Sequence, residues 1–72
     1  MKKLTKKQMD EQVSITCYNQ TDVMTRKEGL DLYLECMMHS EGCEQERYTN
    51  IYLQLMNGLK ECNDSIPACA IY

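Results

Sequence analysis

Residues 25–58 decide the fold, and they read TRKEGLDLYLECMMHSEGCEQERYTNIYLQLMNG. The segment opens with Thr25 and Glu28 in the spacing of a capping box, a pair of side chains that bind free backbone N–H groups at a helix start. Apolar residues then recur every three or four positions, which is the period of one helix face. The pattern predicts a helix over about 25–39 with an apolar face made of Leu30, Tyr33, Leu34, Met37 and Met38.

A second helical period follows over about 43–57, after Ser40, Glu41 and Gly42 interrupt the first. We expect Ser40 or Glu41 to cap the second helix and Gly58 to end it in the left-handed conformation that glycine adopts most easily. Because the connection is short, we predict that the two helices form an αα-hairpin, apolar face against apolar face. The second apolar face consists of Tyr48, Ile51, Tyr52, Leu55 and Leu59.

Shorter segments flank this predicted hairpin. Val13, Ile15 and Cys17 alternate with polar residues, which predicts a half-buried strand over about 12–18, and the polar cluster 19–22 is typical of a turn. Residues 60–65 are expected to be a polar exit from the second helix. The apolar tail 66–72 is expected either to form a C-terminal strand beside 12–18 or to dock across the hairpin. The predicted fold class is therefore small α+β.

The length and charge of the chain limit its organisation and its function. The chain has 72 residues, with 8 Lys+Arg against 11 Asp+Glu and a net charge of -3. A chain of this size forms one domain and leaves little room for a deep catalytic cleft. We predict a basic flexible leader over 1–11 and a single small domain over 12–72. Within the leader, Thr5 and Gln8 have the spacing of a second capping box, so the leader either starts a short helix or frays.

The basic start is not followed by the apolar run of a signal peptide, and no stretch is apolar over the length of a membrane span. We therefore expect a cytoplasmic protein without membrane contacts, whose five cysteines are free thiols that pack as small apolar residues. Cys36, His39 and Cys43, with Cys62 as a fourth candidate, suggest a zinc site. The paired C-x2-C knuckles of such sites are missing, so we predict no metal and no other cofactor.

Catalytic motifs are missing from the sequence. It contains no glycine-rich phosphate loop and no nucleophile elbow, and His39 shows no signature of a base beside an activated thiol. We predict that the protein is not an enzyme and assign no catalytic residues.

Candidate binding residues are those that the predicted core does not need. Acidic residues share one flank of the first helix and surround the turn between the helices; they are Glu28, Asp31, Glu35, Glu41, Glu44 and Glu46. Such a set is either a solvated face or a surface that meets a basic partner. Both apolar arcs are also wider than a contact between two helices requires. The extra residues Leu32, Leu53 and Met56 are a candidate interface for a homodimer or a partner protein, unless the strand and the tail cover them.

The order of helix, short turn and helix is also the outline of a helix-turn-helix DNA reader. Gln45, Arg47, Thr49 and Asn50 are base-reading residue types, although the glutamates at the start of the second helix would face phosphates with like charge. Direct nucleic-acid binding is therefore the weaker alternative. Otherwise the polar arc of this helix is expected to be solvated; its members are Glu46, Arg47, Asn50, Gln54 and Asn57.

Four motifs stand out along the helical segment: Thr25-Arg-Lys-Glu28, Ser40-Glu-Gly42, Glu46-Arg-Tyr-Thr-Asn-Ile-Tyr52 and Gly58. With them the chain resembles, over about 25–64, a set of small uncharacterised proteins carried by conjugative and phage-like elements of Gram-positive gut bacteria. The resemblance implies a mobile-element origin and a helical hairpin, but no activity.

Small acidic proteins of mobile elements commonly bind host machinery, and an acidic surface can occupy a basic nucleic-acid channel. We therefore predict a non-catalytic protein-binding module that inhibits a host defence nuclease in the manner of anti-CRISPR proteins. The expected partner is a basic host nucleic-acid enzyme. A small helix-turn-helix regulator and a structural homodimer are the alternatives.

Overall fold

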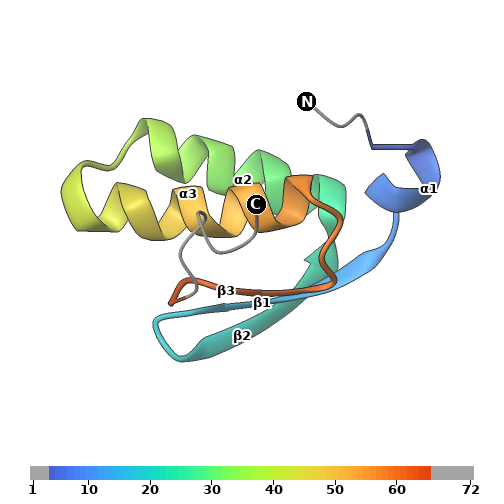
Figure 1. The fold of residues 1–72 in the computed structure, drawn as a ribbon, viewed down its shortest axis with the longest axis horizontal. Coiled ribbons are helices and arrows are strands. Elements are labelled where there is room, and N and C mark those ends of the chain that lie inside the picture. Colours follow the sequence, from blue (N-terminus) through green and yellow to red (C-terminus); the bar gives the residue numbers. More distant parts are fainter. Residues whose placement is uncertain (1–3, 66–72) are drawn as a thin grey trace.

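The computed structural model describes residues 4–65, which form a small α+β fold of two long helices, one short helix and a three-stranded mixed sheet (Figure 1). The predicted fold class is thus confirmed at this level. The elements are α1 (Lys6–Met9), β1 (Gln12–Cys17), β2 (Gln20–Thr25), α2 (Arg26–Met38), α3 (Gly42–Met56) and β3 (Glu61–Asn63).

The strands β1 and β2 form an antiparallel hairpin at one edge of the sheet, whose strand order is β2-β1-β3. Its loop contains only Tyr18 and Asn19, which both have positive φ angles, 52° and 63°. Two such residues match the right-handed twist of the strands that they join. The predicted strand over 12–18 is confirmed by β1. The turn predicted over 19–22 is wrong, because residues 20–22 already belong to β2.

The strand β3 replaces the polar exit that was predicted over 60–65. It runs parallel to β1, with Cys62 opposite Ile15. On its other side, the Gln54 side chain donates to the Asn63 carbonyl oxygen (2.8 Å) and accepts from the Asn63 N–H (3.0 Å). The Gln54 side chain thus makes the hydrogen bonds to Asn63 that a neighbouring strand would otherwise make. The apolar tail 66–72 lies outside the described residues.

The solvated polar arc predicted for the second helix is wrong at two positions. Gln54 is 0% exposed and Asn50 is 9% exposed, because this face of α3 packs toward β3. A polar side chain is well accommodated there since the unpaired edge of β3 offers it backbone partners.

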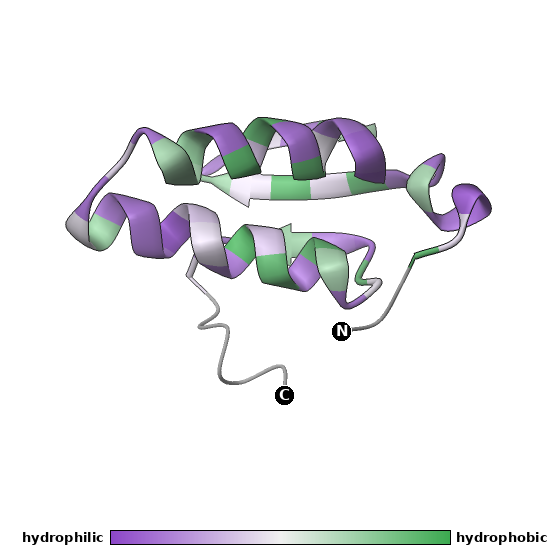
Figure 2. Cartoon of the chain, turned by 90° about the horizontal axis from the view of Figure 1, so that it is seen from above, coloured by the Kyte–Doolittle hydropathy of each residue, from purple (hydrophilic) through white to green (hydrophobic). Residues whose placement is uncertain are grey.

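Both long helices cover the same face of the sheet, and the core lies between the two layers (Figures 1 and 2). Figure 2 looks onto the helix layer, where α2 covers β2 and β1 and α3 covers β3. Gly29 permits this close packing, since a Cβ atom at that position would lie 3.0 Å from the Cδ1 atoms of both Ile15 and Leu55. The buried apolar residues are Val13, Ile15, Leu30, Tyr33, Ile51, Leu55 and Cys62.

The caps that were expected at the ends of the long helices are present in part. Thr25 accepts a hydrogen bond from the Glu28 N–H (3.2 Å), as its capping-box spacing predicts. Gly58 has a φ angle of 86° and ends α3 in a Schellman motif, in which Leu59 N–H donates to the Gln54 carbonyl oxygen (3.2 Å). Glu41 occupies the N-cap position of α3, but its side chain makes no capping hydrogen bond.

Arg26 is the most heavily bonded side chain in the described chain, and it is 0% exposed. Its Nε donates to the Gln8 carbonyl oxygen (3.1 Å), and one terminal nitrogen donates to the Glu11 carboxylate (2.9 Å). The remaining bonds reach carbonyl oxygens at the end of α3, those of Leu55 (3.0 Å), Gly58 (3.3 Å) and Leu59 (2.7 Å). The guanidinium therefore joins the segment before β1, the start of α2 and the end of α3.

We expect Arg26→Lys to lower the free energy of unfolding by about 2–4 kcal/mol, because a lysine ammonium has too few donors to bind these acceptors and leaves buried carbonyl oxygens unpaired. Urea denaturation followed by circular dichroism measures the loss. The neighbouring Lys27 is exposed, so Lys27→Gln is the matched control and changes stability by no more than about 0.5 kcal/mol. Equal stability of Arg26→Lys and the wild type would contradict this account of the fold.

Candidate functional site

A surface hollow lies between the C-terminal half of α2 and the N-terminal half of α3, and we call it the α2–α3 hollow. Its volume is about 380 Å³, and it is lined by Leu32, Glu35, Cys36, His39, Ser40 and Tyr48. Leu32 supplies an apolar wall, and it is 45% exposed. Tyr48 supplies the opposite wall; its ring lies 5.9 Å from that of the buried Tyr33, which fixes its place on α3.

Two carboxylates stand at this hollow. Glu35 lines it directly, and Glu44 accepts a hydrogen bond from the Tyr48 hydroxyl (3.1 Å). Burial together with these two carboxylates raises the pKa of the Cys36 thiol, which shows that both negative charges act on the same place. Burial and the bond to Glu44 raise the pKa of Tyr48 to about 12. The hollow therefore combines an apolar wall with an excess of negative charge.

The six acidic residues singled out in the sequence do not form one continuous surface. Glu28 belongs to the first turn of α2, where the Thr25 hydroxyl donates to its carboxylate (2.9 Å), and Asp31 is exposed one turn further on. Glu41 is exposed at the start of α3. Glu46 lies elsewhere, beside a second hollow that also contains Arg47 and Asp64.

The three predicted interface residues lie in different environments. Leu32 is exposed in the α2–α3 hollow, whereas Met56 is partly buried and packs against the core. Leu53 is half-buried and does not line the hollow. The structure therefore brings Leu32 together with Glu35 rather than with the other two apolar residues.

A second cluster, which we call the Tyr18 clasp, consists of Tyr18, Arg47 and Asp64. The Asp64 carboxylate accepts from the Tyr18 N–H (3.1 Å) and from the Arg47 guanidinium (2.9 Å). The same guanidinium lies 4.9 Å from the centre of the Tyr18 ring, within range of a cation–π interaction. A positive φ angle is strained for a tyrosine, and these contacts hold it in place. The clasp thereby ties the hairpin loop to α3 and to the end of β3.

The residues that suggested DNA reading are engaged within the chain. Arg47 belongs to the Tyr18 clasp, and Asn50 is buried. Gln45 donates to the Met37 carbonyl oxygen (3.0 Å), and the Thr49 hydroxyl donates to the Gln45 carbonyl oxygen (2.7 Å).

Burial raises the pKa of three of the described thiols, Cys17, Cys36 and Cys62. Burial, with the nearby Asp64 carboxylate as a second cause, raises the pKa of Cys17 to about 11, and burial alone raises that of Cys62 to about 11. Cys62 is in the core, so it cannot serve as a fourth ligand beside Cys36 and Cys43. Residues 4–65 contain no group of three or more His, Cys, Asp or Glu side chains arranged to hold a metal ion.

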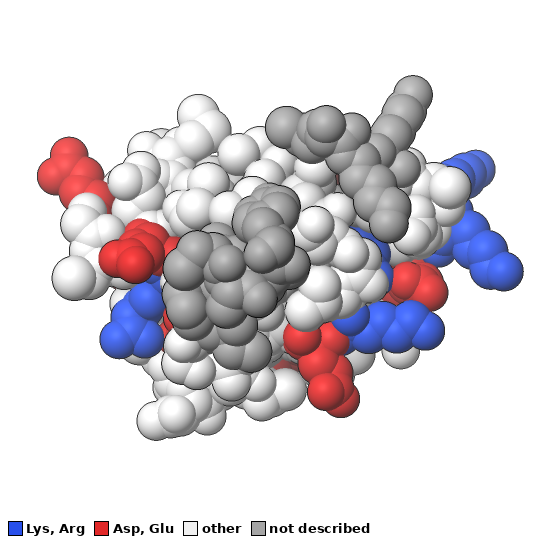
Figure 3. Space-filling model, viewed as in Figure 1, with Lys and Arg blue, Asp and Glu red and all other residues white. Residues whose placement is uncertain are grey.

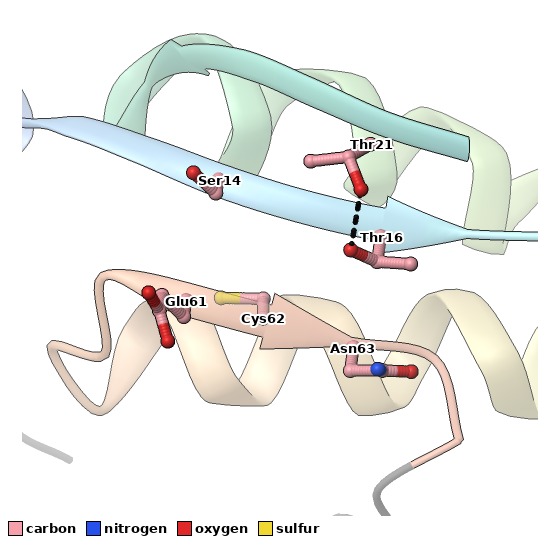
Figure 4. A pocket seen from close by; sticks show the side chains of 6 residues that line it. All are labelled: Ser14, Thr16, Thr21, Glu61, Cys62 and Asn63. Atoms are coloured by element: carbon pink, nitrogen blue, oxygen red, sulfur yellow. Dashed lines mark hydrogen bonds between the residues drawn. The ribbon is translucent and has the colours of Figure 1, made fainter. Parts of the chain in front are cut away.

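On the face of the sheet away from the helices, several polar side chains gather around one hollow (Figure 4). A hollow on it is lined by Ser14, Thr16, Thr21, Glu61, Cys62 and Asn63. The hydroxyls of Thr16 and Thr21 share a hydrogen bond of 2.9 Å across β1 and β2. Because the polar groups here are paired with one another or solvated, this face offers hydroxyl and amide groups but no concentrated charge.

Comparison with known proteins yields no relative: no family model, curated protein sequence or solved structure matches this chain. Within residues 4–65, no helix has both the length and the apolar character needed to cross a membrane. The site therefore has to be interpreted from its own geometry.

The Tyr18 clasp makes stability depend on pH in the acidic range. Hydrogen bonds from Tyr18 and Arg47 outweigh burial and hold the pKa of Asp64 below its ordinary value of 3.8. This stabilisation is complete above pH 3.8 and disappears as the pH falls through the lower pKa of the folded protein. We expect Asp64→Asn to lower the urea midpoint at pH 6 and to make the decline between pH 5 and pH 2.5 shallower than in the wild type.

The matched control for this pH titration is Asp10→Asn, which removes an exposed carboxylate from a different part of the chain. Asp10→Asn should reproduce the wild-type decline. The role assigned to Asp64 is wrong if Asp64→Asn and the wild type lose stability in parallel.

Proposed function

We propose that the protein is a non-catalytic protein-binding module of the cytoplasm and that the α2–α3 hollow is its binding site. The observation that supports this most directly is the juxtaposition of the exposed Leu32 with the carboxylates of Glu35 and Glu44. The proposed site requires α2 and α3 to form the αα-hairpin that their short connection predicts, because each helix supplies one wall of the hollow.

A lysine or arginine side chain of a partner protein suits this hollow. The aliphatic stem of such a side chain packs on apolar surface while its charged head remains among polar groups. Here Leu32 would contact the stem, and Glu35 and Glu44 would receive the charge. An arginine head would gain most, because a guanidinium binds a carboxylate through two parallel hydrogen bonds.

The distribution of charge supports approach to a basic partner from this end of the molecule. In Figure 3, blue surface gathers mainly at the end where α1 lies, whereas red surface is seen at both ends, including the end with the connection between α2 and α3. The residues Glu41 and Glu44 belong to that connection and to the first turn of α3. Because the basic residues gather mainly at the other end, a basic partner would be oriented toward this end before contact, and association would be faster at low salt.

Within this class of function, we propose that the partner is a host defence nuclease. The protein would occupy the basic nucleic-acid channel of this nuclease, in the manner of anti-CRISPR proteins. The resemblance to mobile-element proteins motivates this choice. The helix-turn-helix alternative remains a prediction, and the internal contacts of Arg47 and Asn50 count against it. The homodimer through Leu32, Leu53 and Met56 also remains a prediction.

We expect the double variant Glu35→Lys/Glu44→Lys to weaken inhibition of a purified RNA-guided defence nuclease by at least about 10-fold, because each new lysine repels a basic partner. The measurement is DNA cleavage at increasing concentrations of the protein, at low and at high salt. Wild-type inhibition should decline with salt, and the residual inhibition by the variant should respond less to salt.

The matched control is the double variant Asp10→Lys/Glu61→Lys, which changes the net charge by the same amount at exposed positions away from the hollow. It should inhibit as well as the wild type. If the control lost inhibition equally, the loss would be explained by net charge alone, and the hollow would be refuted as the binding site. A lack of inhibition by the wild type across a panel of such nucleases would refute the choice of partner.

A further inference from the structure

We propose that the free edge of β2, together with the flank of α2 above it, is the interface of a twofold homodimer. This surface differs from the α2–α3 hollow and from the Leu32, Leu53 and Met56 interface, so the proposal does not depend on the proposed function. It rests on the strand edge, on three exposed apolar side chains and on the charges along α2.

The first observation is that the backbone of β2 presents unpaired groups along its outer side. In an antiparallel hairpin with a two-residue loop, the pair beside the loop, Cys17 and Gln20, is hydrogen-bonded, and bonded pairs then alternate along the ladder. The bond from Arg26 N–H to the Glu11 carbonyl oxygen (2.8 Å) continues this alternation. The N–H and C=O groups of Thr21 and Val23 therefore point away from β1.

The two edges of the sheet differ in their protection. Gln54 closes the edge of β3 through both backbone groups of Asn63. Within residues 4–65, no element pairs with the outer side of β2. Natural proteins usually protect a free edge with a proline, a charged residue (most often lysine) or a bulge. The strand β2 contains neither proline nor lysine, and its one charged residue is Asp22, which is exposed on the same face as Ile15. An edge left in this state is suited to pairing with another strand.

The second observation is that exposed apolar side chains accompany this edge. Val23 is 63% exposed on the face of β2 away from the helices, since it pairs with Ser14, and Leu34 and Met38 on the helix side are 41% and 75% exposed. Leu32 and Cys36 mark the flank of α2 that faces α3, because they line the hollow with Tyr48. Leu34 and Met38 occupy the opposite flank, on the side of the molecule where α2 overlies β2 (Figure 2).

A second copy of the chain fits this surface because the surface is self-complementary in charge. The row along the exposed flank of α2 is Lys27, Asp31, Leu34 and Met38, and its two charges have opposite signs. A twofold axis through the paired edges makes the two α2 helices antiparallel, and this orientation allows a register in which Lys27 of each copy pairs with Asp31 of the other. On the strand, the register with Val23 opposite Val23 places Asp22 opposite Met24 and avoids a contact between two aspartates.

Pairing in this register would join the two sheets into one sheet of six strands, with the helices of both copies on one face. The α2–α3 hollows lie on the other flank of each α2 and would remain open. The dimer would therefore present two copies of the proposed binding site.

Sedimentation equilibrium of the full chain, from about 10 µM to about 1 mM, tests this proposal. We expect the wild type to approach about 17 kDa, twice the chain mass of 8.4 kDa, as the concentration rises. Val23→Pro removes an outward N–H group, and Leu34→Lys/Met38→Lys places charge on exposed helix positions where the fold tolerates it. Each change should raise the dimer dissociation constant at least about 10-fold.

The matched control is Leu32→Lys, which adds the same charge on the opposite flank of α2 and should leave the dimer intact. Circular dichroism checks that each variant is folded, and the helix double variant decides the outcome if Val23→Pro unfolds. The proposal is overturned if the wild type stays at 8.4 kDa throughout, or if the helix double variant dimerises as the wild type does. It is also overturned if Leu32→Lys alone abolishes the dimer.

Discussion

A buried guanidinium has to find an acceptor for each of its N–H groups, and in this protein Arg26 finds them in two separate parts of the chain, the segment before β1 and the end of α3. Three of its acceptors are carbonyl oxygens at the end of α3, where the helix dipole is negative and the carbonyls lack partners within the helix. The Glu11 carboxylate balances the charge. Within residues 4–65 the core contains seven buried apolar side chains, which is a small number, so this polar connection is a principal constraint on how the layers fit.

The Tyr18 clasp makes a similar connection at the other end of the sheet. Asp64 joins the hairpin loop to α3 through Tyr18 and Arg47, as Arg26 joins α2 to the end of α3. The polar connections thus fix both ends of the two layers, and α2 keeps exposed apolar side chains on both of its flanks. One flank carries the α2–α3 hollow, and the other continues into the free edge of β2. The same fold therefore supports two separate surfaces without a conflict between them.

The helical part of this fold was predictable from the sequence, because its signals are local. The Thr25 cap, the apolar periods and Gly58 each act within a few residues, and both long helices are found with small shifts at their ends. The strands β2 and β3 were missed for a physical reason. Their inward positions include Gln20, Asp22 and a single cysteine, Cys62, so no apolar alternation marks them. Their pairing with β1 depends on contacts between distant residues.

The candidate site was predictable only in part for the same reason. Leu32, Glu35 and Glu44 were identified, but their meeting at one hollow depends on how α3 packs beside α2. Gln54 was predicted to be solvated and Arg26 was given no structural role, whereas tertiary contacts bury both. One sequence signal did exist for the Tyr18 clasp: Asn19 tolerates a positive φ angle and sits at the end of an alternating segment. Nothing local pointed to Asp64 or Arg47 as its partners.

The most direct test of the central constraint is an NMR spectrum of the protein with 15N-labelled arginine. The chain has two arginines, Arg26 and Arg47, so the exposed Arg47 serves as an internal reference. If Arg26 is bonded as described, its terminal N–H protons give separate signals that exchange slowly with water, while those of Arg47 exchange faster. A single averaged, rapidly exchanging signal from the Arg26 guanidinium would contradict the account.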